Sequence, residues 1–182
     1  MIRKVLLLGS AGLVAIGVLA CHERGHSIGD LYLTHPPHQA TAEIRSTTGN
    51  TAAGTVTFTQ VDGGVRVVAD LRGLSAGRHG WHVHEGNCDA PDATSALGHY
   101  NPTGAPHAGP DDAAHHVGDL GNIEADAQGL AHLDRVYAGL SLDGPNKIVG
   151  HAVILHAGTD DLSSQPAGNS GARVGCGMIV ER

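Results

Sequence analysis

Aromatic side chains are scarce in this sequence of 182 residues, which contains one Trp, one Phe and three Tyr. Its hydrophobic core must therefore consist mainly of Val, Ile, Leu and Ala side chains. The 27 Gly and 8 Pro residues interrupt the chain often, and no stretch shows a convincing helical period. This composition favours short strands joined by many turns over long helices.

Positive charge is also in short supply. The chain has 11 Lys and Arg against 18 Asp and Glu, which gives a formal net charge of −7. Residues 1–20 contain Arg3 and Lys4 and no acid, so without them 9 basic and 18 acidic residues remain, a charge of −9. Because nucleic-acid binding depends on cations that neutralise phosphates, we expect no nucleic-acid partner.

The long hydrophobic run of this chain lies at its N-terminus. Residues 5–20 are uncharged and mostly apolar, and they follow the basic Arg3 and Lys4, as in a secretory signal peptide. The run is short for a membrane-spanning helix. We therefore interpret residues 1–20 as a signal peptide and expect an exported protein.

The residues that end this run, Val18-Leu19-Ala20-Cys21, resemble a bacterial lipobox, in which the cysteine is acylated and becomes the mature N-terminus. We therefore expect a lipoprotein of the periplasm or cell surface that is held to a membrane by a lipid on Cys21. Leu19 is unusual at its position in this pattern. Plain cleavage and retention of the segment as an anchor are the alternatives.

Cysteine is rare, with three residues in the whole chain. If Cys21 carries a lipid, Cys88 and Cys176 remain as a pair. Export places them in an oxidising compartment, where such a pair forms a disulfide. Two unpaired buried thiols are the alternative.

A flexible tether is expected over residues 21–39, which contain Pro36-Pro37, four histidines and no sustained periodicity. From residue 40 onward short alternating segments recur, so we assign one domain to 40–182.

Residues 55–59 and 65–71 flank Asp62-Gly63-Gly64, which predicts a hairpin.

Further strands are expected at 80–85, 130–137, 148–155 and 174–180. The fold class that follows is all-β, a Greek-key β-sandwich or flattened barrel of immunoglobulin-like type. Two long loops are expected at 86–118 and 157–173. Loops of this length in a compact domain are usually functional.

Histidine, by contrast, is abundant, with 14 residues. Imidazole is a common ligand for zinc and copper. His82 and His84 alternate with Val83 in a predicted strand, so both imidazoles lie on one face of the sheet. Two surface histidines would give the same pattern, so specificity depends on the residues that follow, which are His99, His107, His116, Asp119 and His156.

Five segments resemble, in order and with matching spacing, the motifs of the copper/zinc superoxide dismutases, and the match covers about residues 40–182. The segments are 80–85 (GWHVHE), 98–102 (GHYNP), 116–122 (HVGDLGN), 155–157 (LHA) and 168–177 (GNSGARVGCG). The resemblance implies an enzyme that disproportionates superoxide to oxygen and hydrogen peroxide.

By this resemblance the chain holds one copper and one zinc ion, with one histidine shared between them. The implied copper ligands are His82, His84, His99 and His156. The implied zinc ligands are His99, His107, His116 and Asp119. Three imidazoles and one carboxylate form the closed tetrahedral set that structural zinc prefers.

The resemblance also assigns catalytic roles to Arg173, which hydrogen-bonds the anion, and to His99, which takes up a proton. Asp160 corresponds to the carboxylate that links a copper histidine to a zinc histidine, and Asp161 is its neighbouring competitor. His79 corresponds to a histidine that braces the backbone and binds no metal.

One departure from the family pattern concerns charge, because residues 157–172 contain no Lys or Arg to steer an anion. Two other functions remain alternatives: a metal-delivery domain, which would lack a copper histidine or Arg173, and a zinc hydrolase, which would need an open zinc position. Family members include monomers and dimers formed through different surfaces, so a homodimer is left open.

Overall fold

The computed structural model describes residues 38–182. The predicted signal peptide (1–20), the lipidated Cys21 and nearly all of the tether (21–39) lie outside this part of the chain. Within it, no helix has the length and apolar character needed to cross a membrane. The strands of the described residues are β1 (Gln39–Ser46), β2 (Ala53–Val61), β3 (Gly64–Arg72), β4 (Gly77–His84), β5 (Asp119–Ala125), β6 (Ala131–Tyr137), β7 (Ala152–His156) and β8 (Arg173–Glu181).

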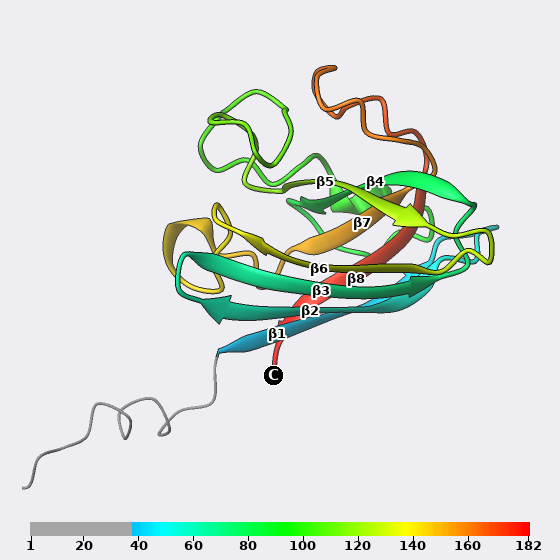
Figure 1. Cartoon of the computed structure of the whole chain (residues 1–182), viewed down its shortest axis with the longest axis horizontal. Helices are drawn as coiled ribbons and strands as arrows, with labels where there is room; N and C mark the ends of the chain where they lie inside the picture. The colour runs from blue at the N-terminus through cyan, green and yellow to red at the C-terminus, as the bar shows by residue number, and fades with distance from the viewer. Residues whose placement is uncertain (1–37) are drawn as a thin grey trace, which may run out of the picture. The chain divides into compact units, whose positions relative to one another are not determined.

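The strands form a closed antiparallel barrel in the order β1-β2-β3-β6-β5-β4-β7-β8. The connections from β3 to β4 and from β6 to β7 cross the barrel, which makes it a Greek key (Figure 1). Pairing of β1 with β8 closes one side, at Ala40↔Glu181 and onward. The other side is joined by Ala125↔Ala131 between β5 and β6. The predicted all-β fold is confirmed, as a barrel rather than an open sandwich.

The hairpin predicted at Asp62-Gly63-Gly64 is present, with β2 and β3 paired from Ala53↔Arg72 to Val61↔Gly64. The strand predicted at 148–155 begins later, at Ala152. Residues 148–151 form a turn instead, closed by a hydrogen bond from the His151 N–H to the Ile148 carbonyl. The apolar residues Ile148 and Val149 alone do not distinguish this turn from a strand.

Strand β4 is buried on both faces, so its polar side chains as well as its apolar ones lie away from solvent. Trp81 and Val83 point into the main core, which fills the barrel. His82 and His84 alternate with them and are also almost fully buried, because two long loops cover the outer face of the sheet. Under the loop that links β4 to β5, a second apolar cluster seals this face, formed by Ala93, Ala96, Ala152, Ile154 and Cys176.

Candidate metal centre

Strands β4 and β7, which are direct neighbours, supply three of the predicted copper-facing histidines. His82 and His84 come from β4, and His156 ends β7, where the pairing register shifts by a bulge. His99 comes from the β4–β5 loop but is held beside β4 by an isolated bridge to His84. These four residues offer ligand atoms that all lie within 4.8 Å of one another.

A second group adjoins the first and shares His99 with it. Asp119 begins β5, and His116 lies one turn earlier, with the Asp119 N–H donating to the His116 carbonyl at 3.0 Å. His107 reaches the group from the middle of the long loop. His99, His107, His116 and Asp119 again place their ligand atoms within 4.8 Å of one another. The structure thus brings together all seven residues that the sequence predicted as ligands.

Among residues 38–182, four ring nitrogens of the first group are buried without a hydrogen-bond partner. They are His82 Nδ1, His84 Nε2, His99 Nε2 and His156 Nε2. Each unsatisfied buried polar atom lowers the stability of the folded state by about 1–3 kcal/mol. Four such atoms together would destabilise the fold strongly if nothing bound them. A bound metal ion removes that penalty, because each nitrogen then has a ligand bond. The donor set therefore fits copper, which accepts imidazole ligands.

The other nitrogen of three of these rings is fixed by a hydrogen bond. His84 Nδ1 donates to the Leu97 carbonyl at 3.0 Å, and His156 Nδ1 donates to the Gly171 carbonyl at 3.1 Å. His82 Nε2 donates to Asp160 Oδ2 at 2.8 Å. Such partners fix the tautomer and the ring orientation, which leaves one nitrogen of each ring free to bind a metal.

The carboxylate of Asp119 organises the second group. Its Oδ1 accepts from His99 Nδ1 at 2.8 Å and His107 Nδ1 at 2.9 Å, and lies 3.2 Å from His116 Nδ1. Its Oδ2 accepts from the backbone N–H of Ala108 and of His116. Three nitrogens and one oxygen thus converge on one point, as in a closed zinc site.

Asp160 connects the two groups. Its Oδ2 accepts from His82 Nε2 at 2.8 Å, and its Oδ1 accepts from His107 Nε2 at 3.0 Å. Asp161, the competitor for this role, instead accepts from the backbone N–H groups of Ser163 and Ser164 and so caps a turn. The geometry therefore favours Asp160.

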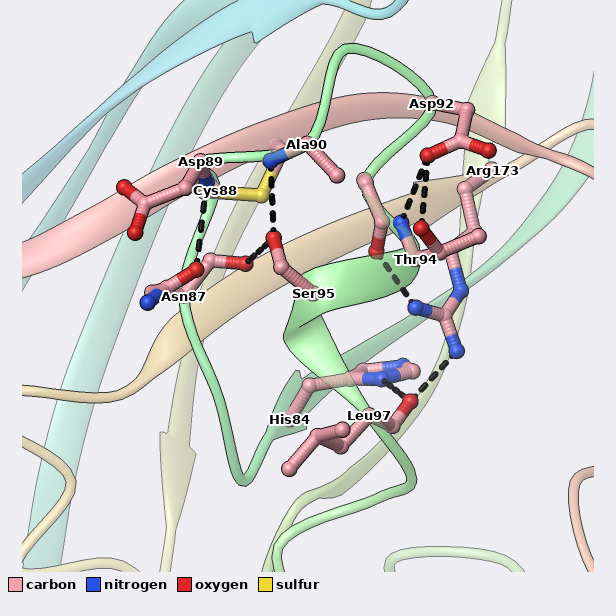
Figure 2. The surroundings of a disulfide bond; sticks show 12 residues. His84, Asn87, Cys88, Asp89, Ala90, Asp92, Thr94, Ser95, Leu97 and Arg173 are labelled. Atoms are coloured by element: carbon pink, nitrogen blue, oxygen red, sulfur yellow. Dashed lines mark hydrogen bonds between the residues drawn. A yellow bond between two sulfur atoms is a disulfide. The ribbon is translucent and has the colours of Figure 1, made fainter.

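Arg173 lies at the edge of the site, at the start of β8. Its guanidinium donates to the Ala93 and Leu97 carbonyls of the β4–β5 loop, and the same Leu97 carbonyl accepts from His84 (Figure 2). The predicted disulfide between Cys88 and Cys176 is confirmed, and it ties this loop to β8. The loop is thus held to β8 by a covalent bond and by the arginine.

Two buried or partly buried histidines outside the ligand groups hydrogen-bond backbone carbonyls. His79 Nδ1 donates to the backbone carbonyl of His156 at 2.8 Å, which agrees with the bracing role expected for it. His151 Nδ1 donates to the Glu85 carbonyl, away from the ligand groups. The side-chain amide of Gln165 hydrogen-bonds both main-chain polar groups of His107, a predicted ligand. No motif or spacing in the sequence singled out Gln165.

Burial lowers the pKa of three histidines in the first group and so favours metal binding to their neutral rings. It lowers the pKa of His82 to about 4, of His84 to about 2 and of His156 to about 3. Metal binding requires neutral imidazoles, and these rings remain neutral in mildly acidic solution. His107 differs, because hydrogen bonds to Asp119 and Asp160 outweigh the effect of burial and raise its pKa to about 9.

These shifts predict an acid-labile metal-free form. The unfolded chain binds protons on histidine at about pH 6.5, whereas folded His82, His84 and His156 resist protonation until much lower pH. The free energy of unfolding should therefore fall as pH decreases from about 6.5 to 4, because the unfolded chain takes up protons that these folded rings do not. His107 acts in the opposite range: its stabilising effect is complete below about pH 6.5 and is lost as pH rises through about 9.

Urea unfolding of the metal-free, oxidised protein at several pH values tests this prediction. The metal-replete protein is the control, since bound ions keep the same rings deprotonated until they are released. A metal-free protein with equal stability at pH 7 and pH 5 would contradict it.

The chain is similar in sequence to a protein-family model and to known relatives, and similar in fold to a solved structure. A family model described as copper/zinc superoxide dismutase matches residues 52–179. An extracellular Cu-Zn superoxide dismutase of Onchocerca volvulus is 37% identical over 177 residues, covering 88% of this chain and 87% of the relative. A Cu-Zn superoxide dismutase of Paramecium bursaria Chlorella virus 1 is 43% identical over 133 residues, covering 69% of this chain and 71% of the relative. The crystal structure of the clock protein EA4 superposes with a TM-score of 0.73 at 40% identity, covering 80% of this chain and 96% of that one.

Proposed function

Since the chain belongs to the copper/zinc superoxide dismutase family, we propose that its two histidine groups hold the two metal ions of that enzyme. The chain disproportionates superoxide to oxygen and hydrogen peroxide and uses copper and zinc as cofactors. We assign copper to His82, His84, His99 and His156. We assign zinc to His99, His107, His116 and Asp119.

The observation that carries this assignment is the set of four buried ring nitrogens without partners. His99 is shared because its Nε2 belongs to that set, while its Nδ1 faces Asp119 Oδ1 at 2.8 Å. The second group is buried and built around a carboxylate that the backbone holds, which supports a structural zinc site and argues against a zinc hydrolase. The metal-delivery alternative would lack a copper histidine or Arg173, and all five residues are present.

The chain's own residues have three tasks in the reaction. When bound, copper supplies a one-electron redox cycle that takes an electron from one superoxide and gives it to another. Arg173 offers a planar cation at the edge of the copper group, oriented by the Ala93 and Leu97 carbonyls, where it attracts and hydrogen-bonds the small anion. His99 can hold and release a proton at Nε2. Asp160 fixes the orientation of the His82 and His107 rings through one hydrogen bond to each.

Metal analysis tests the assignment. The purified, oxidised protein should contain one copper and one zinc per chain, and copper extraction should abolish superoxide removal while zinc stays bound. Adding copper back should restore the rate, whereas adding zinc alone should not. A single ion per chain, or full activity without copper, would contradict the proposal.

Light scattering on the same sample distinguishes a monomer from the homodimer that the family resemblance allows.

We expect weak electrostatic steering, because residues 157–172 contain two aspartates and no Lys or Arg. Arg173 then supplies the local attraction over a short range. The catalytic rate should change by less than about twofold between about 0.01 and 0.2 M salt, whereas steered association falls steeply. Replacing the exposed Ser163 with lysine should raise the rate at low salt and steepen its salt dependence. A steep salt dependence of the unaltered enzyme would refute this expectation.

We also propose that the enzyme is exported and anchored by lipid. The basic and apolar pattern of residues 1–20, the lipobox-like end at Cys21 and the extracellular relative of Onchocerca volvulus support export. Residues 21–39 then serve as the tether for the domain 40–182. Mass spectrometry of the membrane-bound protein should find an acylated Cys21, and the Cys21→Ser variant should lose the anchor but keep activity. An unmodified Cys21 would sink the lipoprotein proposal.

A further inference from the structure

Both main-chain polar groups of His107 are bound by one side chain from the loop that links β7 to β8. The His107 N–H donates to Gln165 Oε1 at 2.8 Å, and Gln165 Nε2 donates to the His107 carbonyl at 2.7 Å. A neighbouring strand offers the same pair of oppositely directed hydrogen bonds to a residue of a sheet. The amide of Gln165 thus takes the place of a strand partner.

His107 depends on this contact more than the other members of its group do. His99 has a bridge to His84, Asp119 belongs to β5, and His116 closes a turn onto Asp119. Within residues 38–182, the backbone–backbone hydrogen bonds include none made by His107. Its main chain is therefore positioned by Gln165.

Gln165 is in turn held by an ordered turn. The carboxylate of Asp161 accepts from the Ser163 and Ser164 N–H groups at 3.0 and 2.8 Å. The Gly168 N–H donates to the Ser164 carbonyl at 2.7 Å, and Gln165 Nε2 donates to the Ser163 carbonyl at 3.1 Å. The amide therefore has a defined position before it meets His107.

The loop that carries Gln165 packs closely against His107 at Gly168. A methyl group on Gly168 would lie 2.7 Å from His107 Nε2 and 1.8 Å from Asp160 Oδ1. The loop that carries Gln165 thus also packs directly on the ring of His107. A shift of the His107 main chain would disturb the hydrogen bonds of its ring with Asp119 and Asp160.

On the ligand assignment proposed above, we propose that Gln165 is a positioning residue for the zinc ion. It fixes the main chain of His107, while Asp160 fixes ring nitrogen Nε2, so that Nδ1 stays directed at the zinc position beside Asp119 Oδ1. Outer partners of metal ligands typically contribute 10–100-fold to metal affinity. The loop that carries Gln165 thus supports zinc binding without supplying a ligand.

Co²⁺ binding in place of zinc tests this inference, because Co²⁺ reports its coordination geometry through visible absorption. The full chain, oxidised and stripped of metal, is titrated with up to one equivalent of Co²⁺ in competition with a chelator. Gln165→Ala should weaken Co²⁺ binding by about 10–100-fold and alter the absorption bands. Gln165→Glu, which keeps an acceptor for the His107 N–H but replaces the donor with an oxygen, should also bind Co²⁺ less tightly. His132→Ala, on the exposed barrel surface, should match the unaltered protein.

Two results separate this inference from the assignment on which it rests. If the unaltered protein takes up no tetrahedral Co²⁺, the zinc assignment itself is wrong. If the unaltered protein binds Co²⁺ as expected and Gln165→Ala keeps both the affinity and the spectrum, the role of Gln165 is wrong while the assignment stands. A lower melting temperature with unchanged Co²⁺ binding overturns it equally, because Gln165 would then support the fold alone.

Discussion

Replacing His156 with alanine should reduce superoxide removal by on the order of 100-fold or more, with one zinc per chain retained. The change removes one of the four unpartnered nitrogens assigned to copper, and His156 makes no hydrogen bond to Asp119, the centre of the zinc group. Copper affinity should fall, while the zinc group keeps all of its donors. Steady-state assays with metal analysis of the same sample measure both effects.

The matched control is His132→Ala, which removes an exposed imidazole that pairs with Asp70 on the barrel surface. That variant should keep its copper content and its activity. If His156→Ala has normal activity at normal copper content, the copper assignment is wrong. If His156→Ala loses zinc as well as copper, the two groups are not independent, contrary to the expectation.

Removing the disulfide should cause a large loss of stability. Cys88 and Cys176 are separated by 88 residues, and a bridge that closes so long a loop restricts the unfolded chain strongly. Replacing both cysteines with alanine should lower the free energy of unfolding by about 4 kcal/mol in chain-entropy models. Activity should also fall, because the loop that offers the Ala93 and Leu97 carbonyls to Arg173 loses its covalent tie.

Chemical denaturation of the metal-free variant and of the metal-free oxidised protein measures the loss of stability directly. Mild reduction of the unaltered protein serves as the comparison, since it breaks the same bond without a substitution. A difference in stability below about 1 kcal/mol would show that native strain offsets the entropic effect.

Most of the candidate metal centre could be predicted because it depends on residue types at ordered spacings. His82 and His84 lie two residues apart in a strand, and alternation alone predicts that they share a face. The hairpin at Asp62-Gly63-Gly64 was predictable for a similar reason, since its turn depends on local residues. The convergence of His99, His107 and His116 with these residues came from the family resemblance and not from local pattern.

The features that escaped prediction depend on contacts between distant residues. The pattern predicts neither β1 nor β5. It predicts a strand at 148–151, where apolar Ile148 is instead buried in a turn. The role of Gln165 depends on where its loop meets His107, 58 residues away. A polar residue in a loop gives no local sign of such a contact.

The narrow connection between β5 and β6 has a consequence for how the barrel opens. These strands share the single register pair Ala125↔Ala131, supplemented by a hydrogen bond from the Tyr137 hydroxyl to the Leu120 carbonyl at 3.0 Å. Local opening follows the weakest set of contacts, so among the strand amides hydrogen exchange should be fastest along this edge. An opened edge exposes unpaired backbone N–H and C=O groups of β5 and β6, which can pair with a strand of another chain. This edge is therefore the expected starting point for aggregation of the protein.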